Sequence, residues 1–222
     1  MRKSAQPLSK HIPMTANLPS LLASDLEGVL IPEIWVCVAE KTGIETLKLT
    51  TREIANYDEL MHIRLCTMRE HGLTIHDVHE VIATIDPLPG AAEFVQWVRT
   101  QTRFVIITDS FYEFIAPIMP KLGYPMVFAH ALEVDDNGVI VGYRLRMPNS
   151  KERAIEGLRH IGFRIMAFGD SYNDATMLGA ADLGIFFNPP ANVRADFPQF
   201  ASVYDYAQLQ ARSRAFLQQH AE

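Results

Sequence analysis

Two acidic residues that follow a short apolar run are the side chains in this sequence best placed to do chemistry. The run at 21–23 is too short for a helix and predicts a buried strand, followed by Asp25, Glu27 and Gly28. Two carboxylates at the end of a buried strand are costly unless a cation or a reaction partner offsets their repulsion. The segment alone therefore leaves two alternatives. It is either a nucleophilic carboxylate with a helper acid and Mg²⁺, or a solvated turn after an edge strand.

Two further apolar runs also end in polar side chains. The runs at 104–107 and 165–168 end at Thr108 and just before Asp170, and Lys151 begins a predicted helix between them. The carboxyl ends of parallel strands share one edge of a sheet, so we expect these groups to converge. Acidic oxygens suit Mg²⁺, and a hydroxyl and an ammonium balance the charge of a phosphoryl group. The combination is typical of a carboxylate that attacks phosphorus to give an aspartyl phosphate.

The hydrophobic periodicity divides the chain into the helices and strands that must position these groups. Between Pro32 and Pro87 only helical patterns occur, at 33–40, 57–70 and 75–83. Strands are predicted at 21–23, 104–107, 127–129, 165–168 and 183–187, with a hairpin of 132–134 and 139–143 around Asn137-Gly138. Further helices are predicted at 91–100, 114–122, 150–160 and 175–181, from Ala191, and at 206–219.

This order of elements predicts an α/β fold with one principal domain. Residues 21–32 and 87–222 are expected to form a Rossmann-like parallel sheet core that carries the β-hairpin. Residues 33–86 are expected to form a small inserted helical cap. Residues 1–20 lack the continuous apolar segment of a signal peptide and are predicted to be a frayed N-terminal extension.

Composition narrows the class of protein. The net charge is −6 and no cluster of Lys or Arg appears, which argues against a nucleic-acid partner. No apolar run approaches the roughly 20 residues that span a bilayer, so no membrane partner is expected. Cys37 and Cys66 match no metal-site spacing and are predicted to be buried thiols in a reducing, cytoplasmic compartment. Five histidines share no zinc-like spacing with them and are predicted to be surface or core residues: His62, His71, His76, His79 and His130.

The motifs, taken in order, resemble those of the haloacid dehalogenase superfamily of phosphatases. Four segments carry the resemblance: Asp25 to Val29, Thr108, Lys151, and Gly169 to Asp174. The resemblance implies that Asp25 is the nucleophile and that Glu27 is the general acid and base. It also implies a Mg²⁺ site formed by Asp25, Glu27 through its main-chain carbonyl, and Asp170, with Asp174 supporting the metal. The implied phosphate-binding residues are Thr108, Asp109, Lys151 and Asn173.

Two positions depart from the usual family pattern. Glu27 stands where an aspartate is usual, and its extra methylene can shift proton delivery by about an ångström. Asp109 and Ser110 follow Thr108, where phosphoserine phosphatases tend to have two glycines.

Within the superfamily the sequence is similar to phosphoserine phosphatases, and more specifically to the ThrH type. The segments Asp25 to Trp35, Thr108 to Phe114 and Gly169 to Asp174 carry this likeness, which includes the glutamate. It implies Mg²⁺-dependent hydrolysis of O-phosphoserine in serine biosynthesis, with transfer of the phosphoryl group to homoserine as a further activity. The cap would then cover the site, with Glu33 facing the substrate ammonium and Arg64 its carboxylate.

Alternatives remain at this level. One is a phosphatase for another small phosphometabolite, and another is a receiver-like signalling domain, which also uses an acidic Mg²⁺ pocket. Receivers carry the acceptor aspartate on a middle strand of a shorter chain, whereas Asp25 ends the first strand. The sequence leaves open the physiological acceptor, the balance of hydrolysis and transfer, the role of residues 1–20 and the oligomeric state, for which a homodimer is one alternative.

Overall fold

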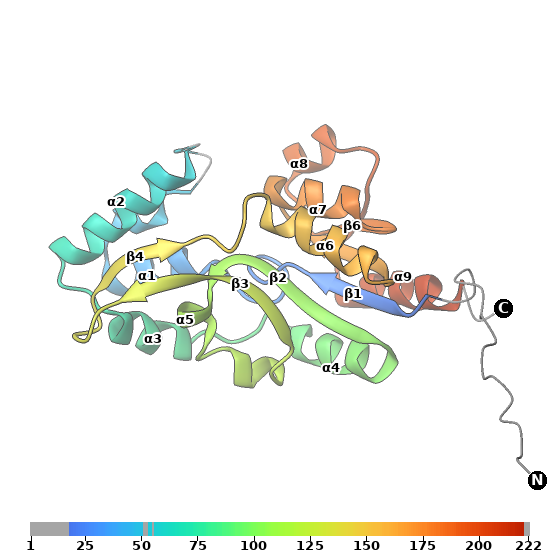
Figure 1. Ribbon diagram of the computed structural model, residues 1–222, viewed down its shortest axis with the longest axis horizontal. Helices are drawn as coiled ribbons and strands as arrows, with labels where there is room; N and C mark the ends of the chain where they lie inside the picture. The colour runs from blue at the N-terminus through green and yellow to red at the C-terminus, as the bar shows by residue number, and fades with distance from the viewer. Residues whose placement is uncertain (1–17, 51–52, 55, 220–222) are drawn as a thin grey trace, which may run out of the picture.

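The computed structural model describes residues 18–50, 53–54 and 56–219 and shows a seven-stranded sheet with helices on both faces (Figure 1). The strand order is β4-β3-β2-β1-β5-β6-β7, and only β4 runs antiparallel to its neighbour. The strands are β1 Ser20–Ser24, β2 Arg103–Phe111, β3 Met126–Val134, β4 Ile140–Arg144, β5 Arg164–Gly169, β6 Leu183–Phe187 and β7 Ala201–Val203. This arrangement confirms the predicted parallel α/β core with a hairpin at its edge.

The α-helices follow the predicted order along the chain. They are α1 Ile34–Thr42, α2 Tyr57–Glu70, α3 Ile75–Ala83, α4 Ala91–Gln101, α5 Tyr112–Ile115, α6 Ser150–His160, α7 Ala175–Ala180, α8 Ala191–Asp196 and α9 Tyr206–Gln218. The 3₁₀ helices are η1 Glu45–Lys48, η2 Met119–Leu122 and η3 Tyr172–Asp174. Helices α4 and α9 cover one face of the sheet, and α6, α7 and α8 cover the other (Figure 1).

Strand β1 lies at the centre of the sheet because its side chains are apolar on both faces. Leu22 joins the hydrophobic cluster under α4 and α9, whereas Leu21 and Ala23 join the cluster under α6 and α7. Strands β2 and β5 flank β1 in parallel register. The three strands therefore end side by side, which places Asp25, Thr108 and Asp170 at one edge of the sheet.

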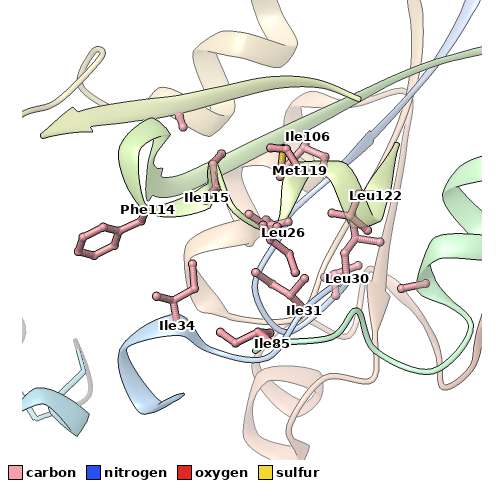
Figure 2. Packing of buried hydrophobic residues seen from close by; sticks show 14 of the residues in the cluster. Leu26, Leu30, Ile31, Ile34, Ile85, Ile106, Phe114, Ile115, Met119 and Leu122 are labelled. Carbon is pink, nitrogen blue, oxygen red and sulfur yellow. The ribbon is translucent and has the colours of Figure 1, made fainter. Parts of the chain in front are cut away.

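The helical insert after β1 packs onto the same hydrophobic cluster as the sheet. Figure 2 shows Leu26 and Ile31 from the turn after β1 beside Ile34 of α1 and Ile115 of α5. Helix α2 has the predicted bounds, and α3 begins at a capping box formed by Thr74 and Asp77. The division into a cap at 33–86 and a separate core stays a prediction, because one cluster joins both.

Several predicted boundaries were wrong. Strand β2 continues past Thr108 to Phe111, strand β3 joins two predicted strands into one, and the three-residue β7 was missed because it is too short to show a period. The predicted helix at 114–122 is two short helices separated around Pro117, which cannot donate a helical hydrogen bond. Of the predicted frayed extension, Ser20 belongs to β1, Leu18 and Pro19 directly precede it, and residues 1–17 lie outside the described residues.

The two cysteines differ from the prediction in their exposure. Cys37 and Cys66 are free thiols, and both are half-buried rather than fully buried. Among the described residues, no helix has both the length and the apolar character needed to cross a membrane.

Candidate active site

A cavity of about 350 Å³ lies at the carboxyl ends of the central strands and brings the predicted site residues together. Nine of the ten predicted residues line it: Asp25, Glu27, Glu33, Arg64, Thr108, Asp109, Lys151, Asp170 and Asn173. The tenth, Asp174, lies fully buried beneath the cavity floor. Side chains from three strand ends, the helical insert and the start of α6 therefore converge on one site.

Lys151 is the central cation of the site. Its Nζ lies 3.0 Å from Asp25 Oδ2, 2.7 Å from Asp174 Oδ1 and 3.6 Å from Asp109 Oδ2. Burial alone would lower the pKa of this ammonium, but the three carboxylates raise it well above its usual value. Lys151 therefore stays charged in the folded protein and can face an anion.

The acids beside Lys151 carry more negative charge than one lysine can neutralise. Oxygens of Asp25, Asp170 and Asp174 lie within 4.8 Å of one another. Burial and the neighbouring Asp174 raise the pKa of Asp25 well above its ordinary value, and burial, Asp174 and Glu33 raise the pKa of Asp170 to about 7. Burial first, and then the mutual repulsion of the carboxylates, therefore disfavour their ionised forms, and a further cation would offset both effects.

The donor set of this acidic group fits a magnesium ion. Both carboxylate oxygens of Asp174 are already occupied, Oδ1 by Lys151 and Oδ2 by the main-chain N–H groups of Asp170 and Ser171 at 2.9 and 3.0 Å. Asp25 and Asp170 line the cavity, whereas Asp174 does not, so these two carboxylates can face a cation there with oxygen atoms, the ligands that Mg²⁺ prefers. Asp174 lies where it supports them.

Gly28 is required where it stands because it adopts a positive φ of 76° beside Asp170. A Cβ at this position would lie 2.4 Å from Asp170 Oδ2. The absence of a side chain therefore lets the turn after β1 approach the carboxylate of Asp170 closely.

Glu27 lies on the same turn and is held at the beginning of α1. The main-chain N–H of Ile34 donates to its Oε2 at 2.7 Å. Burial and the nearby Glu33 raise the pKa of Glu27 to about 7, although the hydrogen bonds from Ile34 and from the Ser110 hydroxyl oppose the shift. A carboxyl group with this pKa can donate a proton at neutral pH and accept one afterwards.

An irregularity in β2 explains why three successive residues reach the cavity. The three residues 108–110 stand opposite the single residue Ala129 of β3, because the register shifts between Ile107 and Phe111. Thr108, Asp109 and Ser110 therefore all line the cavity, which a regular alternating strand would not allow. The Thr108 hydroxyl accepts a hydrogen bond from the Ser110 N–H at 3.1 Å, which leaves its own proton free to donate.

Arg64 and Glu33 face the cavity from the helical insert. The buried guanidinium of Arg64 lies 4.6 Å from the ring centre of Trp35, and its Nη2 donates to the Leu49 carbonyl at 2.8 Å. Its Nε has no hydrogen-bond partner in the part of the chain that the structure describes. Burial lowers the pKa of Arg64 to about 10, so the group remains charged at neutral pH. Arg64 lines the cavity, and a buried guanidinium there is well suited to an anionic ligand.

The sequence reasoning missed several residues that the structure places in or beside the site. Ser110, Tyr57 and Trp35 line the cavity, and His130 is buried behind Asp109. Ser110 could have been found from its position after Thr108, whereas no local pattern relates His130 to Asp109.

Known proteins match this chain in sequence and in fold. The sequence profile of the haloacid dehalogenase-like hydrolases matches residues 20–182. Phosphoserine phosphatase ThrH of Pseudomonas aeruginosa strain PAO1 is 51% identical over 185 residues, covering 83% of this chain and 90% of that protein. A phosphoserine phosphatase of Pseudomonas syringae pv. tomato is 50% identical, covering 83% of this chain and 78% of that protein.

Solved structures show the same fold. A phospho-aspartyl intermediate analogue of phosphoserine phosphatase matches with a TM-score of 0.73 at 21% identity, covering 88% of this chain and 99% of the other. A substrate-bound phosphoserine phosphatase complex matches with a TM-score of 0.72 at 21% identity, covering 88% and 98%.

Proposed function

The chain belongs to the haloacid dehalogenase-like hydrolases, and we propose that it is a phosphatase that hydrolyses O-phosphoserine through an aspartyl phosphate on Asp25. The observation that carries the proposal is the shared cavity. It holds an acidic site that suits phosphoryl transfer and, beside it, the buried guanidinium of Arg64. Relatives that are about half identical and named phosphoserine phosphatase support the choice of substrate.

In the first half-reaction, a carboxylate oxygen of Asp25 attacks phosphorus and the bond to the serine oxygen breaks. Glu27 gives its proton to the departing oxygen, which its pKa of about 7 allows at neutral pH. Thr108, Asn173 and Lys151 would donate hydrogen bonds to the phosphoryl oxygens. The products are serine and an acyl phosphate on Asp25.

In the second half-reaction, Glu27 is ionised and accepts a proton from a water molecule. The resulting hydroxide attacks phosphorus, the acyl phosphate bond breaks, and Asp25 is released with inorganic phosphate. One residue therefore acts first as an acid and then as a base.

Asp25, Asp170 and the main-chain carbonyl of Glu27 are the groups we expect to hold Mg²⁺, with Asp174 orienting them. When bound, the ion neutralises charge on the phosphoryl group. Asp109 is also a proposed phosphate-binding residue. Because an ionised carboxylate only accepts hydrogen bonds, Asp109 can donate to phosphate only through its main-chain N–H.

The amino-acid part of the substrate would occupy the side of the cavity formed by the helical insert. Glu33 would pair with its ammonium and Arg64 with its carboxylate, as a planar guanidinium can do through two N–H groups. Homoserine carries the same two charged groups and a hydroxyl. We therefore propose that it enters after serine leaves and accepts the phosphoryl group in place of water.

A panel of phosphomonoesters, assayed with and without Mg²⁺, tests this function. We expect phosphoserine to give the highest kcat/KM, chelation to abolish turnover, and added homoserine to yield phosphohomoserine. A clear preference for another phosphometabolite would overturn the substrate, and turnover that survives chelation would overturn the metal. A cytoplasmic location and a homodimer stay predictions.

A further inference from the structure

We propose that buried His130 and Asp109 form a positioning pair that holds Asn173, Ser150 and Lys151 in place around the phosphoryl group. The side chains of both residues would act as positioning groups, through neighbours that contact the substrate, in addition to any bond that the main-chain N–H of Asp109 makes to phosphate. This inference rests on the proposed function in that it takes the cavity to be a phosphoryl-transfer site.

Asp109 has polar partners on both of its carboxylate oxygens. Ser150 Oγ donates to Oδ1 at 3.1 Å, and His130 Nε2 lies 3.6 Å from the same oxygen. Asn173 Nδ2 donates to Oδ2 at 3.1 Å, and Lys151 Nζ lies 3.6 Å from it. The carboxylate is thus surrounded by donors from three different elements.

The hydrogen bonds of His130 set the orientation of its ring. The side chain is only 4% exposed, and its Nδ1 accepts a hydrogen bond from the main-chain N–H of Arg146 at 3.0 Å. A main-chain N–H can only donate, so Nδ1 carries no proton in the neutral ring. The proton is therefore on Nε2, the atom that faces Asp109 Oδ1. His130 presents a donor to Asp109 and cannot turn without breaking its bond to Arg146.

These contacts join the parts of the chain that supply the phosphate-binding groups. Asp109 lies in the irregular part of β2, His130 is on β3, and Arg146 is on the connection that leads to α6. Ser150 and Lys151 are the first two residues of α6, and Asn173 lies on η3 after β5. A single carboxylate therefore fixes the start of α6 relative to η3, and His130 fixes the carboxylate.

The charge of Asp109 supports this role. Although burial opposes ionisation, Lys151, His130 and Asn173 hold the pKa of Asp109 well below its usual value. An ionised carboxylate lining a phosphate site would by itself repel the ligand. Its presence there is explained if it orients the donors. Repulsion and orientation predict opposite changes in phosphate affinity when the charge of Asp109 is removed.

Replacement of Asp109 by asparagine tests these explanations, because it shows whether the affinity for inorganic phosphate falls or rises. An amide retains one acceptor and places an NH₂ group against donors, so Asn173 and Lys151 would lose a shared anchor. We expect Asp109→Asn to weaken the binding of inorganic phosphate about threefold to tenfold, measured by calorimetry with Mg²⁺ present, and to lower kcat at least tenfold. If Asp109 only repels phosphate, the same variant would bind phosphate more tightly.

A double-mutant cycle tests whether His130 acts through Asp109. We expect His130→Leu to lower kcat about tenfold in the wild-type background and less than twofold in the Asp109→Asn background. His130→Gln, which keeps a side-chain N–H donor, should recover part of the loss. His79→Leu is the matched control, because His79 is half-buried and bonds the Glu113 carbonyl away from the cavity.

Thermal unfolding of every variant separates positioning from loss of fold. If His130→Leu does not fold, the cycle is made with His130→Gln and with Ser150→Ala, which removes only a hydroxyl. Tighter phosphate binding in Asp109→Asn, or independent effects of the two substitutions that multiply, would overturn the inference. The phosphate measurement needs no turnover, so a wild-type enzyme inactive on phosphoserine would overturn the proposed function and leave this test intact.

Discussion

The substitution Arg64→Ala tests most sharply how the cavity would select an amino-acid phosphate. Arg64 is buried, lies over Trp35 and has an unpartnered Nε among the described residues. Losing one partner of a buried, hydrogen-bonded charge pair costs about 2–5 kcal/mol, much of it from the charge left unpaired. At about 1.4 kcal/mol for each factor of ten, kcat/KM for phosphoserine should fall roughly 30-fold to 4,000-fold.

The assay compares two substrates on one preparation. p-Nitrophenyl phosphate has no carboxylate to lose, so its hydrolysis should change little in Arg64→Ala. Arg64→Lys should be intermediate for phosphoserine, because an ammonium keeps the charge but lacks the planar pair of N–H groups. Arg69→Ala is the matched control, since Arg69 is exposed on the same helix α2 and lies outside the cavity.

Transfer to homoserine should fall together with phosphoserine hydrolysis, because the acceptor would use the same guanidinium. Equal losses for phosphoserine and p-nitrophenyl phosphate would refute the reasoning. Arg64 would then support the fold or the phosphate site, which a lowered melting temperature would reveal.

Three further predictions concern the turn after β1. Glu27→Gln should slow turnover about 10²–10⁴-fold in steady-state assays, and Glu27→Asp should be milder. The folded-state pKa of Glu27 is about 7 against an ordinary 4.5, so the folded protein loses stability as the pH rises between these values. Glutamine cannot ionise and avoids this loss. Chemical unfolding of metal-free protein should therefore show Glu27→Gln to be more stable than the wild type by about 1–3 kcal/mol at pH 8 and hardly more stable at pH 4. Gly28→Ala should raise the Mg²⁺ concentration for half-maximal activity at least tenfold, because its Cβ would displace the Asp170 carboxylate; an unchanged Mg²⁺ dependence would contradict this.

The convergence of the site could be predicted because it depends on features that are local in sequence. Asp25, Thr108 and Asp170 each follow a continuous apolar run, and parallel strands bring their ends together. Helix α2, with Arg64 on it, was predicted to the residue because its helical spacing continues to the stop at His71-Gly72.

The remaining features depend on contacts between distant segments. The register shift in β2 arises from its pairing with β3, and the sequence pattern of β2 does not indicate it. The sequence therefore does not show that Asp109 and Ser110 both face the cavity. Arg64 lies over Trp35 and bonds Leu49, and neither contact has a signal in sequence spacing. His130 on β3 faces Asp109 on the neighbouring strand β2, and only the tertiary fold determines this contact.

The central claim is that Asp25 carries the phosphoryl group between the two half-reactions. The most direct measurement is to quench the enzyme in acid during turnover of radiolabelled phosphoserine and to map the labelled peptide. We predict an acid-stable, alkali-labile label on Asp25, with no label and no turnover in a folded Asp25→Asn variant. Turnover without label, label on another residue, or substantial activity in Asp25→Asn would contradict the account.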